Sequence, residues 1–557
     1  MVSIQDIRKQ LKLQNADAFI ITRNNMFLGQ DVLPQENKIL ELCGFDGSAG
    51  NLIIFDDNAY LLVDGRYSIQ AQQQTAANEI TVITTQDSIG SWIQQNIKKS
   101  SKFLYDPWCH SVSEVDYWKR ALSNHIFITD KNNTLQERTI STSADIFELE
   151  EQYAGISSDE KISYLTEFCQ NNKFDAFLIC ESDSVSWLLN LRSNLLSTTP
   201  ILRAFALVSA SGEVSLFVND FTSLDKELNN YQGKTIAISY NKTPKALQKL
   251  MKEKHIWFHN TTNPIAEWKS IKNPIEISGI KNAHLRDGIA VCRFLSWLEN
   301  NYSSTDELTV VAKLHEFRKQ GDNFHSESFD TIAAFASNGA IVHYHPTTET
   351  NKKLQSGSLL LLDSGAQYLD GTTDITRTIA IGTPTPEMID SYTQVLKAHI
   401  AVLTTVFPQN TAGSAIDTIS RASLWKYGKE YSHGTGHGVG HFLNVHEGPQ
   451  SLSSKSSFPL KANMIVSVEP GFYKENHYGI RIENLALISE THDFEIPMLK
   501  FDSLTLVPYD ISLINQKLLS TFELDFINSY HQQLLNIFKN KLDEETYKWL
   551  QKSCRKI

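Results

Sequence analysis

The sequence has neither a membrane-length apolar run nor a cysteine framework. None of its apolar stretches approaches the ~20 residues that a membrane-spanning helix needs. Its first residues, Met1 to Asp6, open an amphipathic helix and form no apolar core of a secretion signal. The six cysteines are scattered, and no two stand in a C-x-x-C pair. Isolated thiols are typical of a reducing compartment, so we expect a cytoplasmic protein with no membrane partner.

The chain also lacks a basic excess. It has 51 Lys and Arg against 63 Asp and Glu, a formal net charge of -12. Nucleic acids and anionic membranes attract proteins through basic faces, so this balance argues against a nucleic-acid partner. Hydrophobic residues at 41% and charged residues at 20% are ordinary for a globular protein.

An internal repeat organises the first half of the chain. At 557 residues the chain is too long for one hydrophobic core, and its length predicts roughly three or four domains. Residues 4–25 pass from an amphipathic helix into an apolar strand that contains Asp17-Ala18-Phe19, and residues 162–180 repeat this plan with Asp175-Ala176-Phe177. Helix–strand starts recur by chance in α/β proteins, but the shared Asp-Ala-Phe favours two similar α/β domains.

Composition and periodicity place the remaining boundaries. The polar, acidic stretch from Asp130 to Ser158 is interpreted as a linker, and a helical pattern without proline runs from Ile275 to Glu299. Near the C-terminus an apolar stripe recurs every four residues, which more often marks packing within one chain than an oligomer contact: Phe522, Phe526, Tyr530 and Leu534. We predict domains at 1–140, 155–272 and 273–510, followed by a helical extension at 511–557.

The chemistry-bearing residues begin with two aspartates on neighbouring strands. An apolar strand ends in Asp363, and Asp374 opens a β-branched strand just after the turn signal Asp370-Gly371. A strict two-residue turn at Asp370-Gly371 would offset the two aspartates by four residues, roughly 13 Å along the strand. If both carboxylates address one point, the hairpin must centre near Tyr368 and Leu369 and its turn must be wider than this dipeptide.

A histidine- and glycine-rich segment follows. Within fourteen residues, at 433–446, stand His433, His437, His441 and His446, of 17 histidines in the whole chain. Glycine removes side-chain bulk and permits positive φ, so a ligand and its neighbours can approach closely. The segment does not fit a dinucleotide-binding loop, because the context is wrong and imidazoles crowd it. His441, like His345 elsewhere, is expected to be a polar or packing histidine.

Two later apolar strands each carry one glutamate. Glu469 ends the first strand, and in the second Ile480 and Ile482 alternate with Arg481 and Glu483. Buried glutamates are costly unless paired or metal-bound.

Together Asp363, Asp374, His437, Glu469 and Glu483 form an anionic, oxygen-rich set that suits two divalent ions, namely Mn²⁺, Co²⁺, Fe²⁺ or Zn²⁺. The alternative for single members is structural, since Asp363 or Glu483 can form an ion pair with Arg481 or Arg377. The joint order Asp–Asp–His–Glu–Glu favours the metal site.

These motifs resemble the pita-bread metallopeptidases, a family that includes methionine aminopeptidases, prolidases and Xaa-Pro aminopeptidases. The similarity is greatest to the cytosolic, three-domain Xaa-Pro aminopeptidases and covers nearly the whole chain. It rests on these segments: 44–50, 64–67, 187–192, Ala340–Tyr344, Asp363–Tyr368, Asp370–Thr378, His433–Gly440, Phe442–Pro449, Glu469–Gly471 and Gly479–Asn484.

The resemblance implies an α/β (α+β) protein with two similar N-terminal domains and a catalytic pita-bread domain built on a curved antiparallel sheet. It implies two metal ions, often manganese, with Asp363 on one metal, Asp374 and Glu483 bridging, and His437 and Glu469 completing the shells. His343, His433 and His446 match active-site histidines that are not ligands. Arg481 is expected to support the ligands from behind, and a homodimer is expected.

The expected reaction is removal of an N-terminal residue that precedes proline, by attack of a hydroxide that bridges the two metals. Glu469 is expected to take and return the proton. His433 or His446 would stabilise the oxyanion, and His343, His433 and His446 would line the substrate site. The alternatives are a prolidase restricted to Xaa-Pro dipeptides and a non-catalytic binding or chaperone protein. Non-catalytic relatives of this family typically lack some of the metal ligands. The creatinase-like enzymes, which share the fold without metals, also lack the full set.

Overall fold

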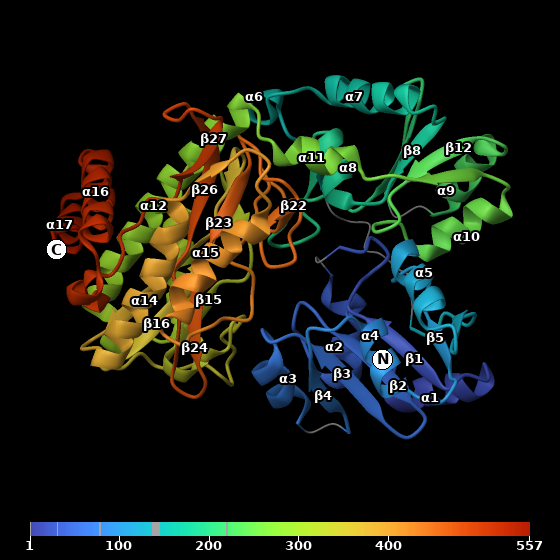
Figure 1. The fold of residues 1–557 in the computed structure, drawn as a ribbon, viewed down its shortest axis with the longest axis horizontal. Coiled ribbons are helices and arrows are strands. Elements are labelled where there is room, and N and C mark those ends of the chain that lie inside the picture. Colours follow the sequence, from blue (N-terminus) through green and yellow to red (C-terminus); the bar gives the residue numbers. More distant parts are fainter. Residues whose placement is uncertain (1, 30–31, 77–78, 136–144, 219–220) are drawn as a thin grey trace. The chain divides into compact units, whose positions relative to one another are not determined.

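A computed structural model describes residues 2–29, 32–76, 79–135, 145–218 and 221–557 (Figure 1). The chain divides into two compact units, which are described separately. Unit 1 comprises residues 1–148, 156–196 and 201–265, and unit 2 comprises residues 149–155, 197–200 and 266–557. Residues 136–144 of the predicted linker lie outside the described ranges. The boundaries predicted from the sequence stay a prediction.

Unit 1 begins with a six-stranded mixed sheet in the order β4-β3-β2-β1-β5-β6. Its strands are β1 (Ala18–Thr22), β2 (Asn51–Phe55), β3 (Ala59–Val63), β4 (Thr81–Thr84), β5 (Lys102–Tyr105) and β6 (Ile126–Thr129). Its helices are α1 (Ile4–Leu13), α2 (Lys38–Cys43), α3 (Ser68–Thr75), α4 (Ile89–Asn96) and α5 (Val112–Ala121). Alternate residues of β1 enter different cores, Phe19 and Ile21 on one side and Ala18 and Ile20 on the other. A strand that is apolar throughout is therefore covered on both faces.

A second sheet in unit 1 repeats this plan in the order β11-β10-β8-β12-β13. Its strands are β8 (Ala176–Ile179), β10 (Phe205–Ser209), β11 (Val214–Phe217), β12 (Thr235–Ile238) and β13 (Trp257–Asn260). Its helices are α7 (Ser158–Asn171), α8 (Ser182–Leu188), α9 (Phe221–Leu228) and α10 (Lys245–Glu253). β8 pairs antiparallel with β10 and parallel with β12, just as β1 pairs with β2 and β5.

The aspartate of each Asp-Ala-Phe repeat has the same structural role. Asp17 Oδ2 accepts a hydrogen bond of 2.7 Å from the backbone N–H of Lys102, and its own N–H donates to the Lys102 carbonyl at 2.8 Å. Asp175 makes the equivalent pair with Thr235, at 2.7 and 2.9 Å. Each aspartate thus fixes the start of the parallel strand pair, which explains why the repeat keeps it and confirms the predicted duplication.

The described end of the predicted linker carries two short elements. Strand β7 (Ile146–Glu148) pairs antiparallel with β9 (Leu191–Ser193), and helix α6 (Glu151–Ala154) follows. The α6 helix belongs to unit 2, where the Asn273 side chain donates to the Ala154 carbonyl at 2.9 Å. Asn273 also caps α12 (Pro274–Asn301), so the predicted long helix begins beside α6.

In unit 2, every strand pair among the described residues is antiparallel. One sheet has the order β15-β16-β19, with β15 (Ile332–Phe335), β16 (Ser358–Ser364) and β19 (Ile375–Ile381). A six-stranded sheet has β20 (Val406–Pro408), β27 (Met498–Ser503), β26 (Asn484–Thr491), β23 (Ile465–Val468), β21 (Gly436–Gly438) and β22 (Glu447–Leu452). Smaller sheets join β14 (Phe324–Glu327), β17 (Ala366–Tyr368) and β18 (Gly371–Thr372), and pair β24 (Gly471–Lys474) with β25 (Tyr478–Arg481).

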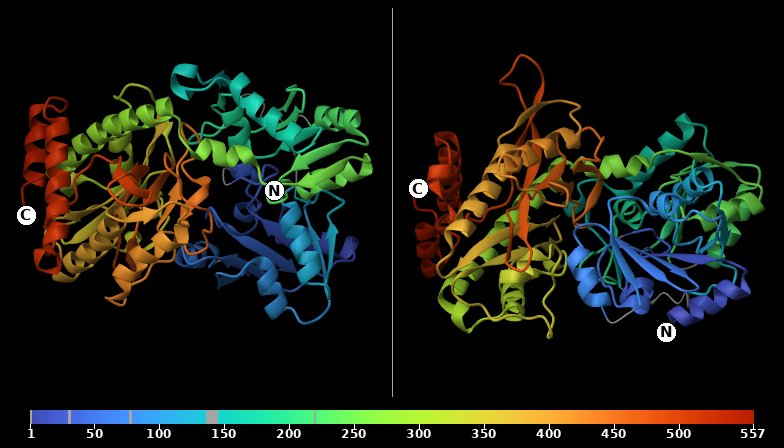
Figure 2. Two further views of the ribbon diagram at one scale, coloured as in Figure 1. Left: turned by 45° about the horizontal axis from the view of Figure 1, so that its top comes forward. Right: turned by 60° about the horizontal axis from the view of Figure 1, so that its bottom comes forward.

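The sheets of unit 2 meet where the candidate site lies. The backbone N–H of Glu483, between β25 and β26, donates to the Thr376 carbonyl of β19 at 3.1 Å. Helices α12, α13 (Glu307–Arg318), α14 (Pro386–Leu403) and α15 (Gly413–Trp425) pack around the strands (Figure 2). The expected α/β class with an antiparallel catalytic sheet is confirmed. No helix within the described ranges combines the length and the apolarity that crossing a bilayer requires.

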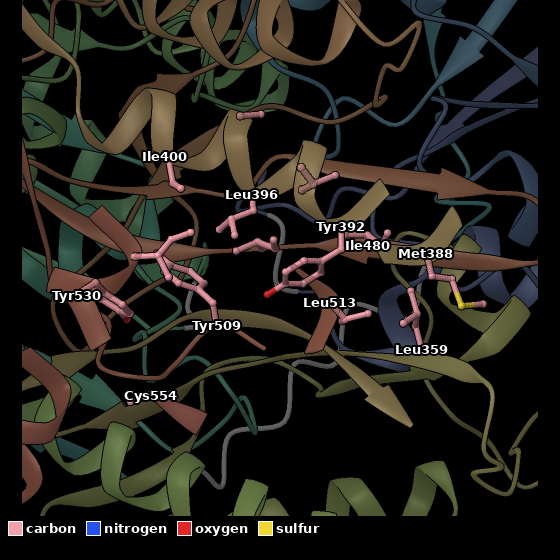
Figure 3. Close-up of a cluster of buried hydrophobic side chains, with 14 of the residues drawn as sticks. Leu359, Met388, Tyr392, Leu396, Ile400, Ile480, Tyr509, Leu513, Tyr530 and Cys554 are labelled. Carbon is pink, nitrogen blue, oxygen red and sulfur yellow. The ribbon is translucent and has the colours of Figure 1, made fainter. Parts of the chain in front are cut away.

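The C-terminal helices α16 (Thr521–Phe538) and α17 (Glu544–Ser553) pack onto the core of unit 2. Of the predicted apolar stripe, Tyr530 and Leu534 are buried beside Tyr392 and Tyr509 (Figure 3). Phe522, at the start of α16, remains 62% exposed. The C-terminal half of the stripe therefore packs within the chain. Phe522 is exposed because a helix has 3.6 residues per turn, so a strict four-residue repeat gradually leaves the buried face.

Candidate metal centre

The two aspartates come together through a tighter turn than the sequence predicts. Asp363 pairs with Thr376 in the β16–β19 ladder, and the hairpin tip turns on only two residues, Leu369 and Asp370. The predicted wider turn is wrong. Asp374 is displaced by two residues from the partner of Asp363, and an offset of two keeps both on one face as diagonal neighbours. Asp374 also stands between β18 and β19, outside the ladder, so pairing does not fix its backbone.

Arg481 donates two hydrogen bonds to one carboxylate oxygen of Asp363 and none to the other. Its Nη2 donates to Asp363 Oδ2 at 2.5 Å and its Nε reaches the same oxygen at 3.2 Å. Nη1 donates to the hydroxyl of Tyr473 at 2.6 Å. The predicted supporting role of Arg481 is therefore matched by a direct ion pair. Arg377 forms no such pair with any carboxylate in the part of the chain that the structure describes. Its guanidinium donates to backbone carbonyls, among them that of Glu483 at 2.6 Å.

Three of the predicted ligands converge closely. Asp374, His437 and Glu483 each offer one ligand atom, and these atoms lie within 4.8 Å of one another. His437 Nε2 stands 3.5 Å from Asp374 Oδ2 and 3.6 Å from Glu469 Oε1. Thr376 Oγ1 donates to Glu483 Oε2 at 2.8 Å, which orients that carboxylate.

The His437 ring is held in the tautomer that a ligand needs. Its Nδ1 lies 2.9 Å from the carbonyl oxygen of Gly438, and a carbonyl only accepts hydrogen bonds. The proton therefore sits on Nδ1, and the lone pair of Nε2 faces Asp374 and Glu469. Its backbone N–H donates to Ser467 Oγ at 2.9 Å, so the neighbouring β23 strand fixes the position of the residue. Fixing the second ring nitrogen in this way is typical of metal-binding histidines.

His433 is engaged at both ring nitrogens. Nδ1 lies 2.8 Å from the Gly434 carbonyl, and Nε2 lies 2.8 Å from the Tyr473 hydroxyl. Because Nδ1 carries the proton and donates it to the Gly434 carbonyl, Nε2 accepts from the Tyr473 hydroxyl, which in turn accepts from Arg481 Nη1. His433 Nδ1 also stands 3.8 Å from Glu469 Oε2. A hydrogen-bonded chain thus links Asp363, through Arg481 and Tyr473, to His433.

The other two predicted histidines lie on neighbouring loops. The ring of His446 contacts that of His437 edge to face, with 4.3 Å between centroids. His343 is half-buried in the turn that follows the 3₁₀ segment Ala336–Ala340. The neighbouring Tyr344 anchors that turn through its hydroxyl, which donates to Glu307 at 2.8 Å. Both non-candidates behave as expected: His345 is exposed, and His441 Nε2 contacts the Tyr153 carbonyl at 3.0 Å.

Glycine at Gly436 and Gly479 is required by close backbone contacts. A Cβ on Gly436 would lie 1.8 Å from the Ser467 carbonyl oxygen, and one on Gly479 would lie 1.7 Å from that of Gly339. Gly436 in the histidine segment is needed because it has no side chain. The prediction that glycines of this segment adopt positive φ is wrong, since the described glycines with positive φ lie elsewhere. Close packing of β21 on β23 thereby brings His437 to Glu469.

Helix α15 supports the same segment from behind. Asp417 Oδ1 accepts from Thr435 Oγ1 at 2.7 Å, and Arg421 Nη2 donates to the His433 carbonyl at 2.6 Å. Arg421 and Asp417 are themselves paired at 2.8 Å. The backbone between His433 and His437 is therefore fixed by charged side chains of one helix face, at positions i and i+4.

The carboxylates of the site are buried and repel one another, so a positive charge would stabilise their ionised forms. Burial, followed by repulsion from neighbouring carboxylates, raises the pKa of both Asp374 and Glu483 well above the ordinary range. Burial also raises the pKa of Glu469. Burial opposes the charge of Arg481, but Tyr473, Asp363 and Glu469 outweigh it and raise its pKa. One guanidinium beside four carboxylates leaves most of the negative charge uncompensated.

Three buried carboxylate oxygens have the chemistry that a divalent cation prefers. Asp363 Oδ1, Asp374 Oδ1 and Glu483 Oε1 are buried and accept no hydrogen bond from any described residue. Buried charged oxygens without partners cost several kcal/mol, whereas divalent cations of the manganese group prefer such oxygens. The donor set, hard oxygens with one imidazole, thus fits the metals that the sequence predicts.

Sequence reasoning missed three residues that orient the candidate ligands: Thr376, Ser467 and Tyr473. Thr376 was detectable, because it follows Asp374 by two residues in the β-branched strand predicted from the sequence and so shares its face there. Ser467 likewise precedes Glu469 by two residues, and donates to Glu469 Oε1 at 3.3 Å. Tyr473 carries no such signal; only the pairing of β24 with β25 brings it to Arg481. Burial raises the pKa of Tyr473 to about 12, which keeps its hydroxyl protonated.

Family models match almost the whole chain. The model of metallopeptidase family M24 matches residues 278–490, and a model of its C-terminal region matches residues 497–557. Two models of the creatinase/prolidase N-terminal domain match residues 4–138 and 137–276. A curated relative, Xaa-Pro aminopeptidase 1 of Dictyostelium discoideum, is 34% identical over 100% of this chain and 96% of its own length. The chain belongs to metallopeptidase family M24.

Other M24 members show the same full-length similarity. An Xaa-Pro aminopeptidase of Drosophila melanogaster is 34% identical over 97% of this chain and 95% of its own length. The crystal structure of an X-prolyl aminopeptidase from Caenorhabditis elegans superposes with a TM-score of 0.93 at 28% identity, over 100% of this chain and 99% of that one. That protein is described as a cytosolic enzyme with a di-nuclear active site.

Proposed function

We propose that this chain is an Xaa-Pro aminopeptidase, a metal-dependent hydrolase that removes the N-terminal residue of a peptide when proline follows. The observation that carries this proposal is the convergence of Asp374, His437 and Glu483, with unpartnered carboxylate oxygens at the same place. The relatives bearing this name match both N-terminal repeats as well as the catalytic region. This argues against the prolidase alternative.

The metals would be held by the five residues predicted from the sequence, and we propose Mn²⁺ for both. Asp363 would offer Oδ1, the oxygen that Arg481 leaves without a partner, and Asp374 and Glu483 would lie between the two ions. His437 would bind through Nε2, and Glu469 through its carboxylate. Two such ions, when bound, acidify water and polarise an amide carbonyl.

The surrounding side chains would hold the substrate and move the proton. Glu469 directly follows β23, and its backbone N–H donates to the Thr435 carbonyl at 2.7 Å, so its carboxylate is fixed beside His437 and His433. It is the group placed to accept a proton from the attacking water and to pass it to the leaving proline nitrogen. That nitrogen has no N–H, so recognition must rest on ring shape. His343 and His446 are the proposed walls for the ring, and His446 is the proposed donor to the oxyanion. Both ring nitrogens of His433 are engaged by Gly434 and Tyr473, so its proposed role is to hold Tyr473 and Glu469 beside the substrate.

We further propose a cytoplasmic location and a homodimer. The first is supported by four buried cysteines that form no disulfide with any described residue, Cys169, Cys180, Cys292 and Cys554. Thiols outside disulfides persist best in a reducing compartment.

The deciding experiment compares Xaa-Pro dipeptides with longer Xaa-Pro peptides, each assayed with added Mn²⁺ and with a chelator. We expect release of the first residue from the longer peptides, loss of turnover with chelator and recovery with Mn²⁺. Cleavage of dipeptides alone would establish the prolidase alternative. Full activity in a sample shown by metal analysis to be metal-free would overturn the metal mechanism.

A further inference from the structure

Unit 1 contains a cavity that the proposed peptidase reaction does not use. Its volume is about 880 Å³, within the ~300–1,000 Å³ typical of small-molecule sites. It opens where helices α5 and α10 lie near each other (Figure 1). These helices are equivalents in the two repeats, since each follows the strand that pairs parallel with the first strand of its sheet.

The two repeats are joined rigidly beside this cavity. The backbone N–H groups of Val112 and Ser113 donate to the carbonyls of Thr243 and Tyr240, both at 3.0 Å. In return the N–H of Lys245 donates to the His110 carbonyl at 2.9 Å. Backbone bonds in both directions fix the starts of α5 and α10 against each other, so the cavity walls belong to regular, anchored elements.

The cavity lining is strongly basic. One face of α10 supplies Lys245, Lys249 and Lys252 at positions i, i+4 and i+7, and Lys119 of α5 and Lys131 complete a set of five lysines. Asp116 is the one carboxylate among the described lining residues, and it is already paired with Lys245 at 2.5 Å. In a chain with a net charge of -12, this local excess of positive charge is unusual.

These positive charges repel one another. Burial, and then the charges of Lys245 and Lys252, lower the pKa of Lys119. Lys245 also occupies the first residue of α10, the end of a helix where the backbone dipole disfavours a cation. Like charges on neighbouring turns destabilise a helix. A bound anion would offset the repulsion between these lysines, so their spacing favours anion binding.

The inner wall of the cavity is apolar and aromatic. Tyr105, Pro107 and Phe127 contribute to it, and the two aromatic side chains are buried. A ligand that fits therefore joins a compact carbon skeleton to several negative charges. We propose that this cavity binds a small metabolite carrying two or more phosphate groups, with Lys119, Lys249 and Lys252 as the main phosphate contacts.

The test is calorimetric titration of the metal-loaded protein with ADP and with fructose 1,6-bisphosphate, against adenosine and fructose as uncharged counterparts. We expect at least one of the two phosphorylated compounds to bind, neither uncharged compound to bind, and affinity to fall with added salt. The double variant K249Q/K252Q should weaken binding by about tenfold or more, because it removes two of the charged donors to phosphate.

The matched control is K539Q/K541Q, which removes two exposed lysines of the C-terminal region. Gln and Lys have similar helix propensities, so neither pair of changes should unfold a helix. The control should bind like the parent protein, which also separates cavity binding from chelation of the metals by phosphate. Absence of binding by both ADP and fructose 1,6-bisphosphate at millimolar concentration, or equal binding by the two double variants, would overturn the proposal.

Discussion

The Nη2 atom of Arg481 lies 2.5 Å from Oδ2 of Asp363, and both side chains are buried. Nε of the same guanidinium contacts the same oxygen, so Oδ1 of Asp363 is left without a partner. The structural and functional interpretations of Asp363 are therefore compatible. One oxygen serves the ion pair, and the other is available to a metal.

Replacing Arg481 with Met should weaken both folding and metal binding. Removing one partner of a buried ion pair typically costs about 3–5 kcal/mol, and the freed Asp363 and Tyr473 would lose their orientation. Thermal unfolding and the metal content per chain measure the two effects. The exposed Arg555→Met is the control and should change neither. An unchanged melting temperature in Arg481→Met would show that the pair contributes nothing to folding.

The histidines should separate into a ligand and supporting groups. His437→Ala removes the Nε2 donor and should lower metal content and turnover together. His433→Ala should keep the metals, because both its ring nitrogens are engaged elsewhere. It should slow turnover by roughly 10²-fold, the scale for a small misplacement of the reacting groups. His446→Ala should behave like His433→Ala. Metal analysis beside kinetics decides the matter: a metal-free His433→Ala protein would show that the ligand assignment is wrong.

Replacing Glu469 should mainly affect turnover, whereas replacing Glu483 should also affect metal binding. Glu469→Gln keeps the shape of the side chain but cannot cycle a proton, so turnover should fall on the order of 10²–10⁴-fold with at least one metal retained. Glu483→Gln should lower metal occupancy and activity in parallel, because Glu483 is proposed to bind both ions. Near-normal turnover in a fully metallated Glu469→Gln would assign the proton transfer to another group, with His433 the first to test.

Stability should fall in acid partly because of His399. Burial lowers the pKa of this histidine from 6.5 to about 3, between the Val468 carbonyl and the Tyr509 hydroxyl. Below pH 6.5 the unfolded chain binds a proton that the folded chain does not bind. The free energy of unfolding therefore falls by about 1.4 kcal/mol per pH unit until about pH 3. Urea midpoints at about pH 8 and pH 5 should differ less for His399→Gln than for the parent. The exposed His492→Gln should leave that difference unchanged.

A homodimer predicts a mass in solution of twice the 63.0 kDa of one chain. Light scattering at micromolar concentration measures it directly. The apolar stripe of α16 does not supply the contact, because Tyr530 and Leu534 are buried within the chain. A mass equal to one chain would refute the prediction.

The sequence by itself pointed to the candidate ligands, of which the structure brings Asp374, His437 and Glu483 within reach of one cation. Strand ends, glycine spacing and the order of carboxylates around His437 are local patterns, and so is the Asp-Ala-Phe repeat that marks the duplicated domain. The alternation of Ile480 and Ile482 with Arg481 and Glu483 was likewise readable, and both isoleucines are buried in one core.

Tertiary structure alone decided how these residues meet. The two-residue turn at Leu369 and Asp370 set the offset of the aspartates, because hairpin register depends on which residues pair across the turn. The choice of Arg481 over Arg377 as partner of Asp363, and the entry of Tyr473, depend on side chains that arrive from different strands. Sequence spacing fixes the direction of a side chain along its own strand, but the distance to another strand is fixed only when the sheets pack.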